Sequence, residues 1–320
     1  MMDIKLLTVR SEIAAGTRGA GMGIDALIVA SLDQKSTFFS DYSVQNIDDV
    51  NNILFKNNQY PNAKHIDGVH TMLERVSNAT SNVLTKENTP FVLAGDHSTA
   101  AGTISGIKKS FPEKKLGVIW IDAHADFHSP FTTPSGNMHG MPLAIVTHID
   151  NKEEAVNSPN QETLDYWDRI KSVGTSTPKL AAEDIVFIGV RDTETPENVI
   201  INKYGIKNYT VDEVRQLGAI ETAHEALKKL EDCDMIYVSF DVDSMDPSIS
   251  KGTGTPVEHG LTVEEALTIN TTLVSSEKLV CWEMVEVNPT LDKHNTMANN
   301  AFHILTETVK SYKHNRTVKA

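Results

Sequence analysis

Short apolar segments alternate along the chain with longer stretches that have helical periodicity. Five of the apolar segments are rich in Val, Ile or aromatic residues and show little alternation between apolar and polar positions. This pattern is typical of parallel strands that are covered on both faces. The predicted strands are residues 91–94, 116–121, 184–190, 235–240 and 279–287.

Helical segments lie between and around these predicted strands. One of them begins with Thr262, followed three residues later by Glu265, which is the arrangement of a capping box. The predicted helices are residues 66–84, 99–110, 222–230 and 262–274. Strands that alternate with helices predict an α/β fold in three layers (α/β/α), with a mainly parallel sheet between the helical layers.

We predict a single domain over residues 1–320, because no linker-like stretch divides the chain. A length of 320 residues and an apolar fraction of 40% are sufficient for one large core. The stretch from about residue 151 to residue 180 is rich in Ser, Thr, Asn and Pro, and we interpret it as a polar insertion or a mobile connection.

The composition disfavours several classes of protein. Asp and Glu number 43 against 29 Lys and Arg, and the net charge of −14 disfavours nucleic acid or an anionic membrane as a partner. No apolar run approaches the ~20 residues of a membrane-spanning helix, and the N-terminus lacks the apolar core of a signal peptide. Cys233 and Cys281 imply no disulfide framework, so we predict a protein of the reducing cytoplasm.

Acidic and histidine residues follow three of the predicted strands, in the sequences GDHS (95–98), DAHAD (122–126) and DVD (241–243). Open α/β sheets bind ligands at the carboxyl ends of their strands, where all three clusters are expected. Residues two apart in an extended chain point to the same side, so the clusters are expected to converge. The candidate metal ligands are His97, Asp122, His124, Asp126, Asp241 and Asp243.

Four carboxylates and two imidazoles at a buried rim would repel one another and lose hydration without a cation. Four negative charges suit two divalent ions better than one. The set is rich in carboxylate and has no thiolate, which favours manganese, with cobalt, nickel, iron and zinc as substitutes. Two ions about 3.5–4 Å apart can share a bridging water and lower its pKa, which yields a hydroxide for attack on a carbon centre.

Each cluster also has a purely structural interpretation. In GDHS, Asp96 or Ser98 can cap a helix, and DVD alone can begin a loop or bind calcium or magnesium. DAHAD is the strongest single indication of a metal, because acidic and histidine residues alternate just after an apolar strand. The occurrence of all three clusters at strand ends favours the metal interpretation.

These motifs resemble those of a known family. GDHS, DAHAD and SFDVDSMDP (239–247) are similar to the three signature motifs of the ureohydrolases, the family that includes arginases and agmatinases. The resemblance extends from about residue 90 to residue 305. Within the family, SGNMHGMP (135–142), GTGTPV (252–257) and EVNPTLD (286–292) favour the arginase branch. The resemblance implies an arginase/deacetylase-like α/β/α fold and a homo-oligomer, either a trimer or a hexamer.

The resemblance also implies that two manganese ions are bound by the six candidate ligands. The implied assignment is His97 and Asp126 to one ion, His124 and Asp243 to the other, and Asp122 and Asp241 to both.

Roles in catalysis and substrate binding follow from the same resemblance. Glu286 would pair with the substrate guanidinium, as a carboxylate at a strand end can do in a bidentate manner. His139, in a glycine-flanked loop, would act as proton shuttle or as general acid to the leaving amine. The predicted catalytic residues are His139, Glu286 and Asp126, and the predicted substrate contacts are His128, Ser135, Asn137, Glu194, Thr255 and Glu286.

Two of these positions differ from the family pattern. His128 stands where arginases commonly have asparagine, and Glu194 stands where they commonly have aspartate. Both positions contact the amino-acid end of the substrate in the family, so the differences put selectivity for arginine in question.

The sequence therefore predicts hydrolysis of the L-arginine guanidinium group to L-ornithine and urea by a hydroxide that bridges two manganese ions. The first alternative is an agmatinase or another guanidino-acid ureohydrolase, although Ser135 and Asn137 suit a substrate with a carboxylate, which agmatine lacks. A formiminoglutamase matches the 135–142 loop less well. Two alternatives belong to other classes: a non-catalytic family member that acts as a binding or regulatory subunit, and a deacetylase of similar architecture, whose site usually holds one zinc ion.

Overall fold

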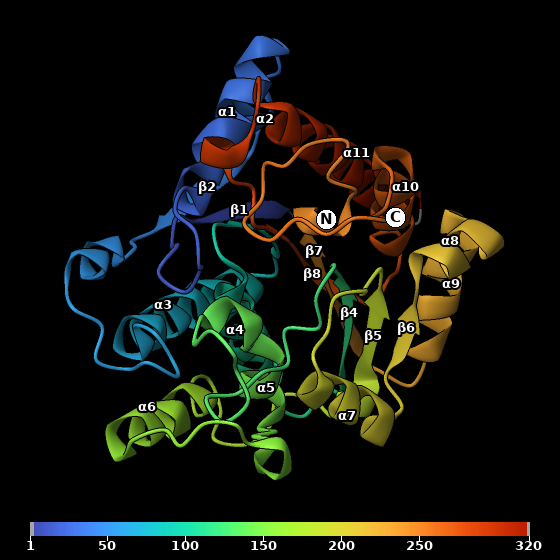
Figure 1. Cartoon of the computed structure of the whole chain (residues 1–320). Coiled ribbons are helices and arrows are strands. Elements are labelled where there is room, and N and C mark those ends of the chain that lie inside the picture. The colour runs from blue at the N-terminus through green and yellow to red at the C-terminus, as the bar shows by residue number, and fades with distance from the viewer. Residues whose placement is uncertain (1–2, 319–320) are drawn as a thin grey trace.

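Residues 3–318 are described by the structure, which is a computed structural model. Their strands form one sheet in the order β2-β1-β3-β8-β7-β4-β5-β6, and every neighbouring pair is parallel (Figure 1). The strands are β1 (Ile4–Val9), β2 (Ser43–Ile47), β3 (Thr89–Ala94), β4 (Leu116–Ile121), β5 (Ile185–Ile188), β6 (Lys207–Tyr209), β7 (Met235–Asp241) and β8 (Leu279–Val285).

Helices cover both faces of this sheet, which confirms the predicted three-layer α/β/α fold (Figure 1). One face packs against α3 (Ile66–Leu84), α4 (Ala100–Ser110), α5 (Pro142–Thr147), α6 (Gln161–Lys171) and α7 (Thr195–Tyr204). The other packs against α1 (Gly23–Asp33), α2 (Phe38–Asp41), α8 (Val211–Leu217), α9 (Ala219–Lys229), α10 (Val263–Leu273) and α11 (Thr296–Val318). None of the helices within residues 3–318 combines the length and the apolar character of a transmembrane span.

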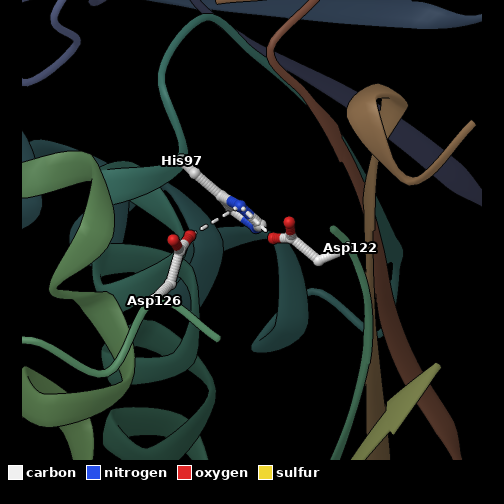
Figure 2. A group of neighbouring side chains, drawn as sticks. All are labelled: His97, Asp122 and Asp126. Atoms are coloured by element: carbon white, nitrogen blue, oxygen red, sulfur yellow. Dashed lines mark ion pairs between the residues drawn. The ribbon is translucent and has the colours of Figure 1, made fainter. Parts of the chain in front are cut away.

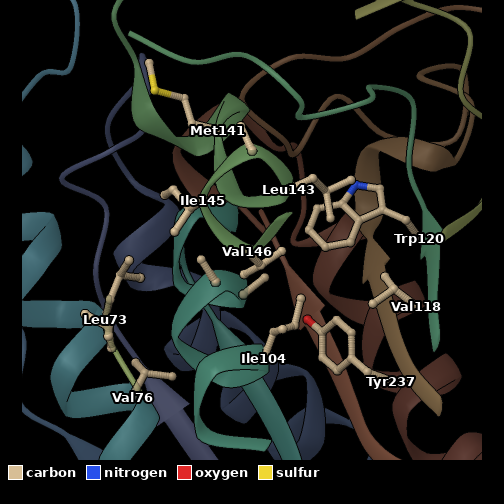
Figure 3. Close-up of a cluster of buried hydrophobic side chains, with 14 of the residues drawn as sticks. Leu73, Val76, Ile104, Val118, Trp120, Met141, Leu143, Ile145, Val146 and Tyr237 are labelled. Carbon is tan, nitrogen blue, oxygen red and sulfur yellow. The ribbon is translucent and has the colours of Figure 1, made fainter. Parts of the chain in front are cut away.

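The alternation of side chains along each strand divides the core into two halves. In β4, Val118 and Trp120 belong to the half covered by α3 and α4, whereas Ile119 and Ile121 belong to the half covered by α10 and α11. Figure 3 shows part of the first half, where Trp120 lies close to Leu143 of α5. A strand that is buried on both faces is apolar at successive positions, which explains why these segments lack alternation in the sequence.

The five predicted strands are all present, as β3, β4, β5, β7 and β8. The prediction omitted β1, β2 and β6. The edge strand β2 has the polar sequence SVQNI, and β6 has only three residues, so neither contains an apolar run. β1 (IKLLTV) does contain such a run, and its signal was available.

The predicted helices correspond to α3, α4, α9 and α10. The capping box at the start of α10 is confirmed. The backbone N–H of Glu265 donates to Thr262 Oγ1 at 3.1 Å, and the backbone N–H of Thr262 donates to Glu265 Oε2 at 2.8 Å. Two otherwise unpaired donors of the first turn are thereby satisfied.

The interpretation of residues 151–180 as an insertion or a mobile connection missed the helix α6. Asn160 caps its first turn, since Asn160 Oδ1 accepts a hydrogen bond from the backbone N–H of Thr163 at 2.8 Å. Trp167 and Ile170 are buried in the core half that contains α3. Because only a narrow stripe of α6 is apolar, the overall polar composition of this stretch concealed the helix.

Lys179 lies after the carboxyl end of α6 and binds carbonyl groups at that end and just beyond it. Its replacement tests how much these hydrogen bonds contribute to stability. The residue is 1% exposed, and its ammonium donates to the carbonyl oxygens of Lys171 and Thr175. We expect Lys179→Met to lower the free energy of unfolding by about 2 kcal/mol in urea denaturation, because the Thr175 carbonyl loses its donor and the Lys171 carbonyl keeps only His148 Nε2. Lys229→Met, at an exposed position of α9, is the control and should change this energy by less than about 0.5 kcal/mol. Equal effects of the two substitutions would contradict the prediction.

Candidate metal centre and pocket

The candidate site lies at the carboxyl ends of four adjacent strands in the middle of the sheet. These strands are β3, β8, β7 and β4, in that order. His97 follows β3, Glu286 follows β8, Asp241 ends β7 and Asp122 follows β4. Because the strands are parallel, their carboxyl ends meet at one edge, where the three clusters were predicted to converge.

A first group of side chains surrounds one ring nitrogen of His97. Its Nδ1 lies 3.1 Å from Asp122 Oδ2, 3.1 Å from Asp126 Oδ2 and 3.2 Å from Asp241 Oδ2. Figure 2 shows the imidazole between the carboxylates of Asp122 and Asp126, which both belong to the DAHAD segment. All four side chains are buried, so these contacts are shielded from solvent.

A second group lies beside the first and shares Asp122 with it. His124 Nδ1 is 3.0 Å from Asp243 Oδ2 and 3.4 Å from Asp122 Oδ1. The two oxygens of Asp122 thus face different histidines, with Oδ2 towards His97 and Oδ1 towards His124. One carboxylate therefore lies between two possible metal positions. The structure brings together all six residues that were predicted as ligands.

The six side chains have the spacing and the chemistry of a metal-binding set. Ligand atoms ~2.1 Å from a common ion and at right angles to each other are ~3 Å apart, which matches the closest distances around His97 Nδ1 and His124 Nδ1. His97 Nδ1 and Asp122 Oδ2 are buried without a hydrogen bond, and a cation between them would serve both. Oxygen and imidazole ligands without thiolate suit manganese and related divalent ions.

Excess negative charge in this cluster affects its protonation equilibria. Burial raises the pKa of Asp126, Asp241 and Asp243, and the charge of a neighbouring carboxylate raises each pKa further. Burial opposes protonation of His97, but the surrounding carboxylates outweigh it, and the pKa of His97 lies well above its usual value. Bound divalent cations offset the same negative charge in place of protons.

Two residues that the sequence analysis did not identify contact His97. Ser239 Oγ lies 2.8 Å from His97 Nε2, and the indole of Trp120 stacks on the imidazole with ring centroids 4.0 Å apart. These contacts fix the orientation of the ring, so that Nδ1 faces the carboxylates. Ser239 precedes Asp241 by two positions in β7, so both lie on one side of the strand. The two-residue spacing that indicated the ligands was therefore also a signal for Ser239.

Glu286 and His139, the predicted catalytic pair, contact each other. Glu286 Oε1 accepts a hydrogen bond from the backbone N–H of His97 at 3.0 Å and lies 3.1 Å from His139 Nδ1. Burial lowers the pKa of His139, but its hydrogen bond to Glu286 and the charge of that carboxylate outweigh the effect, so the pKa is raised. His139 lines the pocket, whereas Glu286 is 2% exposed and does not. His139 thus lies between the pocket and the carboxylate.

His128 and Glu194, two of the predicted substrate contacts, line the pocket and also contact each other. His128 Nε2 lies 2.8 Å from Glu194 Oε2 and 3.6 Å from Glu197 Oε2, and its Nδ1 lies 3.1 Å from Thr132 Oγ1. Glu194 and Glu197 form the capping box of α7, which places both acids beside the imidazole. The hydrogen bond to His128 holds the pKa of Glu194 well below its usual value, whereas burial raises that of Glu197 to about 7. The side chains at the two positions that differ from the family pattern are therefore hydrogen-bond partners of each other.

The remaining predicted substrate contacts, Ser135, Asn137 and Thr255, also line the pocket. The backbone N–H of Asn137 donates to Ser135 Oγ at 3.1 Å, and Thr255 Oγ1 donates to Asp243 Oδ2 at 3.2 Å. The pocket thus has uncharged polar side chains at Ser135 and Asn137 and acidic side chains at Asp192, Glu194 and Glu197. Such a combination suits a small polar molecule that carries a positive charge.

Comparisons with known proteins find relatives over nearly the whole chain. Residues 2–310 match the Arginase family. An arginase of Brevibacillus brevis is 34% identical over 306 residues, which cover 93% of this chain and 95% of the relative. The structure of an arginase from Bacillus caldovelox is similar, with a TM-score of 0.81 and 31% identity over 96% of this chain and 98% of that one. A formimidoylglutamase from Bacillus subtilis has a TM-score of 0.73 at 20% identity over 98% of this chain and 88% of that one, a likeness that concerns the fold alone.

Proposed function

Because this chain belongs to the arginase family, we propose that it hydrolyses the guanidinium group of L-arginine to L-ornithine and urea. The observation that carries this proposal is the pair of ligand groups that share Asp122, with Glu286 next to His97. Two adjacent metal positions suit the activation of water. A buried carboxylate beside them suits the binding of a planar cation.

We infer that the site binds two manganese ions. When bound, the ions lower the pKa of water, so that a nucleophile is available near neutral pH. His97 and Asp126 would hold one ion, His124 and Asp243 the other, and Asp122 and Asp241 both. Ser239 and Trp120 would support this arrangement by fixing the ring of His97.

Glu286 would bind the substrate guanidinium, and His139 would transfer a proton. Because His139 Nδ1 lies 3.1 Å from Glu286 Oε1, a guanidinium that binds both carboxylate oxygens would displace the imidazole from Oε1. The released imidazole is then in the pocket and can donate a proton to the leaving amine. Asp126, beside His97, completes the proposed catalytic set.

Another guanidino compound is the second candidate substrate, and the contact between His128 and Glu194 favours it. At a distance of 2.8 Å, the imidazole and the carboxylate satisfy each other and compete with the amino-acid end of arginine. Agmatine, which has no carboxylate, and shorter guanidino acids need fewer contacts at this end of the pocket. A non-catalytic role is less well supported, since all six candidate ligands are in place.

Urea release separates these candidates. The protein would be loaded with manganese and assayed with arginine, agmatine and shorter guanidino acids, with a metal-free preparation as the control. We expect manganese-dependent release mainly from arginine. Release mainly from another compound would support metal-dependent hydrolysis of a guanidinium group but would show that arginine is not the preferred substrate. No release from any of them, with two metals bound per chain, would refute the proposed hydrolysis.

We also propose that the protein is a cytoplasmic homo-oligomer, either a trimer or a hexamer. The free and buried state of Cys233 and Cys281 is compatible with a reducing compartment. Sedimentation velocity at micromolar concentration would give the mass of the assembly. A monomer of 35.2 kDa would contradict the oligomer.

A further inference from the structure

We propose that Lys64 is a specificity-determining residue, which orients Asn137 so that the pocket recognises the carboxylate of an amino-acid substrate. This inference rests on the proposed function, because it assigns the amino-acid end of the substrate to the loop of residues 135–140. Lys64 lies just before α3 and belongs to none of the motifs identified in the sequence. It acts through Asn137 and is therefore a positioning residue.

Two hydrogen bonds connect Lys64 with this loop. Its Nζ donates to Asn137 Oδ1 at 3.0 Å, and its backbone N–H donates to the carbonyl oxygen of Gly136 at 2.7 Å. An ammonium group has donors and no acceptor, so it fixes which end of the Asn137 amide faces it. The Nδ2 group, which is a donor, then lies on the side of Gly16. A donor from a pocket-lining side chain is suited to a carboxylate.

The backbone around Asn137 restricts other positions of its amide. Gly136 has a φ of +75°, and a side chain at this position would lie 2.0 Å from the carbonyl oxygen of Pro61. A side chain at Gly16 would lie 2.6 Å from Asn137 Nδ2. The loop is thus packed closely against two N-terminal segments of the chain, at residues 16 and 61–64. Lys64 therefore acts on an amide that has little room to rearrange.

Positive charge beside Asn137 also matters because the same pocket contains the carboxylates of Glu194 and Glu197. These acids repel a substrate carboxylate and attract a substrate ammonium. Lys64, hydrogen-bonded to the loop of Asn137, opposes that repulsion. The pocket thus combines a donor held by Lys64, which suits a carboxylate, with acids that suit an ammonium once Glu194 exchanges His128 for the substrate.

A second cation, Arg18, belongs to the N-terminal segment that packs against the loop of Asn137 at residue 16. Burial lowers the pKa of His65, and the charges of Arg18 and Lys64 lower it further, against the opposing effect of Asp67. The Arg18 guanidinium donates to the carbonyl oxygens of Glu12 and Ala15 and so stays with the N-terminal segment. The whole chain is acidic, with a net charge of −14. Arg18 and Lys64 therefore place positive charge beside the loop in a protein that is negatively charged overall.

Binding of two product-like probes tests this proposal. L-ornithine and 1,4-diaminobutane differ by one carboxylate, and their affinities for the manganese-loaded protein would be measured by isothermal titration calorimetry. We expect Lys64→Met to weaken binding of L-ornithine about tenfold and to leave binding of 1,4-diaminobutane unchanged, because only the carboxylate uses the oriented amide. Lys64→Arg keeps the charge and the donors and should restore affinity to within about threefold.

Lys86→Met is the matched control, because Lys86 is an exposed lysine just beyond the other end of α3. The 19 residues of this helix separate the two lysines by ~28 Å, and the control should not change either affinity. Equal weakening of both probes by Lys64→Met would show a merely structural role and overturn the proposal, as would no effect on either probe. Wild-type protein that binds L-ornithine no more tightly than 1,4-diaminobutane would also overturn it. The urea assay is separate, so a different hydrolysed substrate would refute the proposed function without changing these binding results.

Discussion

Replacement of Asp126 by asparagine is expected to abolish two-metal occupancy and to lower turnover by about 10³-fold or more, because a lost ion removes several kcal/mol of transition-state stabilisation. Asp126 Oδ2 lies 3.1 Å from His97 Nδ1 in the first ligand group. Asparagine has the same shape, but its neutral amide binds a divalent ion more weakly than a carboxylate does. Asparagine also tolerates the φ of +50° at this position, so the backbone should be retained.

Elemental analysis would give the metal content of the Asp126→Asn variant, and urea release would give its turnover. Asp165→Asn changes an exposed carboxylate of α6 and should leave both quantities at the wild-type level. Circular dichroism of the metal-free proteins would show whether the fold is intact. Two ions per chain in Asp126→Asn would exclude Asp126 from the ligand set.

Glu286→Gln is expected to lower kcat/KM by at least about 10²-fold, with the metal content unchanged. Glu286 Oε1 accepts a hydrogen bond from the backbone N–H of His97, so the glutamine oxygen should take this position and direct its NH2 group elsewhere. A guanidinium has donors only, so it would meet a donor where it needs an acceptor. The loss of one charge-assisted hydrogen bond, at about 1.5–3 kcal/mol, and the weakening of the other by removal of the charge give the expected factor.

The guanidinium is common to every candidate substrate, so Glu286→Gln should reduce kcat/KM for arginine and agmatine by the same factor. Steady-state kinetics with both compounds would measure this. Glu258→Gln, at an exposed loop position, is the control. Wild-type kcat/KM in the Glu286 variant would remove Glu286 from guanidinium binding, and loss of metal would show that it supports the ligands instead.

The candidate ligands could be predicted because their spacing follows from the geometry of a strand. Asp241 ends β7 and Asp122 follows β4, and these two strands are neighbours in the sheet. Strands buried on both faces are uniformly apolar, so their ends are easily recognised and the polar residues that follow them stand out. Ser239 could have been added by the same reasoning, because it shares a side of β7 with Asp241.

Contacts between distant segments could not be predicted in this way. His128 and Glu194 are 66 positions apart, and Lys64 and Asn137 are 73 positions apart. Periodicity describes one element at a time and contains no information on which loops meet. Backbone conformation was equally inaccessible: Asp126 and Glu286 have φ values of +50° and +65°, which side chains of this type adopt at a cost of about 1–2 kcal/mol. The packed loops around these residues impose this conformation.

The position of β8 determines when the sheet can be completed as the chain is synthesised. This strand is the last in the described chain, yet it lies in the middle of the sheet, between β3 and β7. Until it emerges during synthesis, β2-β1-β3 and β7-β4-β5-β6 are separate blocks, each with an open edge that is prone to wrong pairing. Glu286 arrives with the same strand. A nascent chain that ends before residue 279 therefore lacks the strand that joins the two halves of the sheet. The two halves can join only when Glu286, the last predicted catalytic residue along the chain, is also being added.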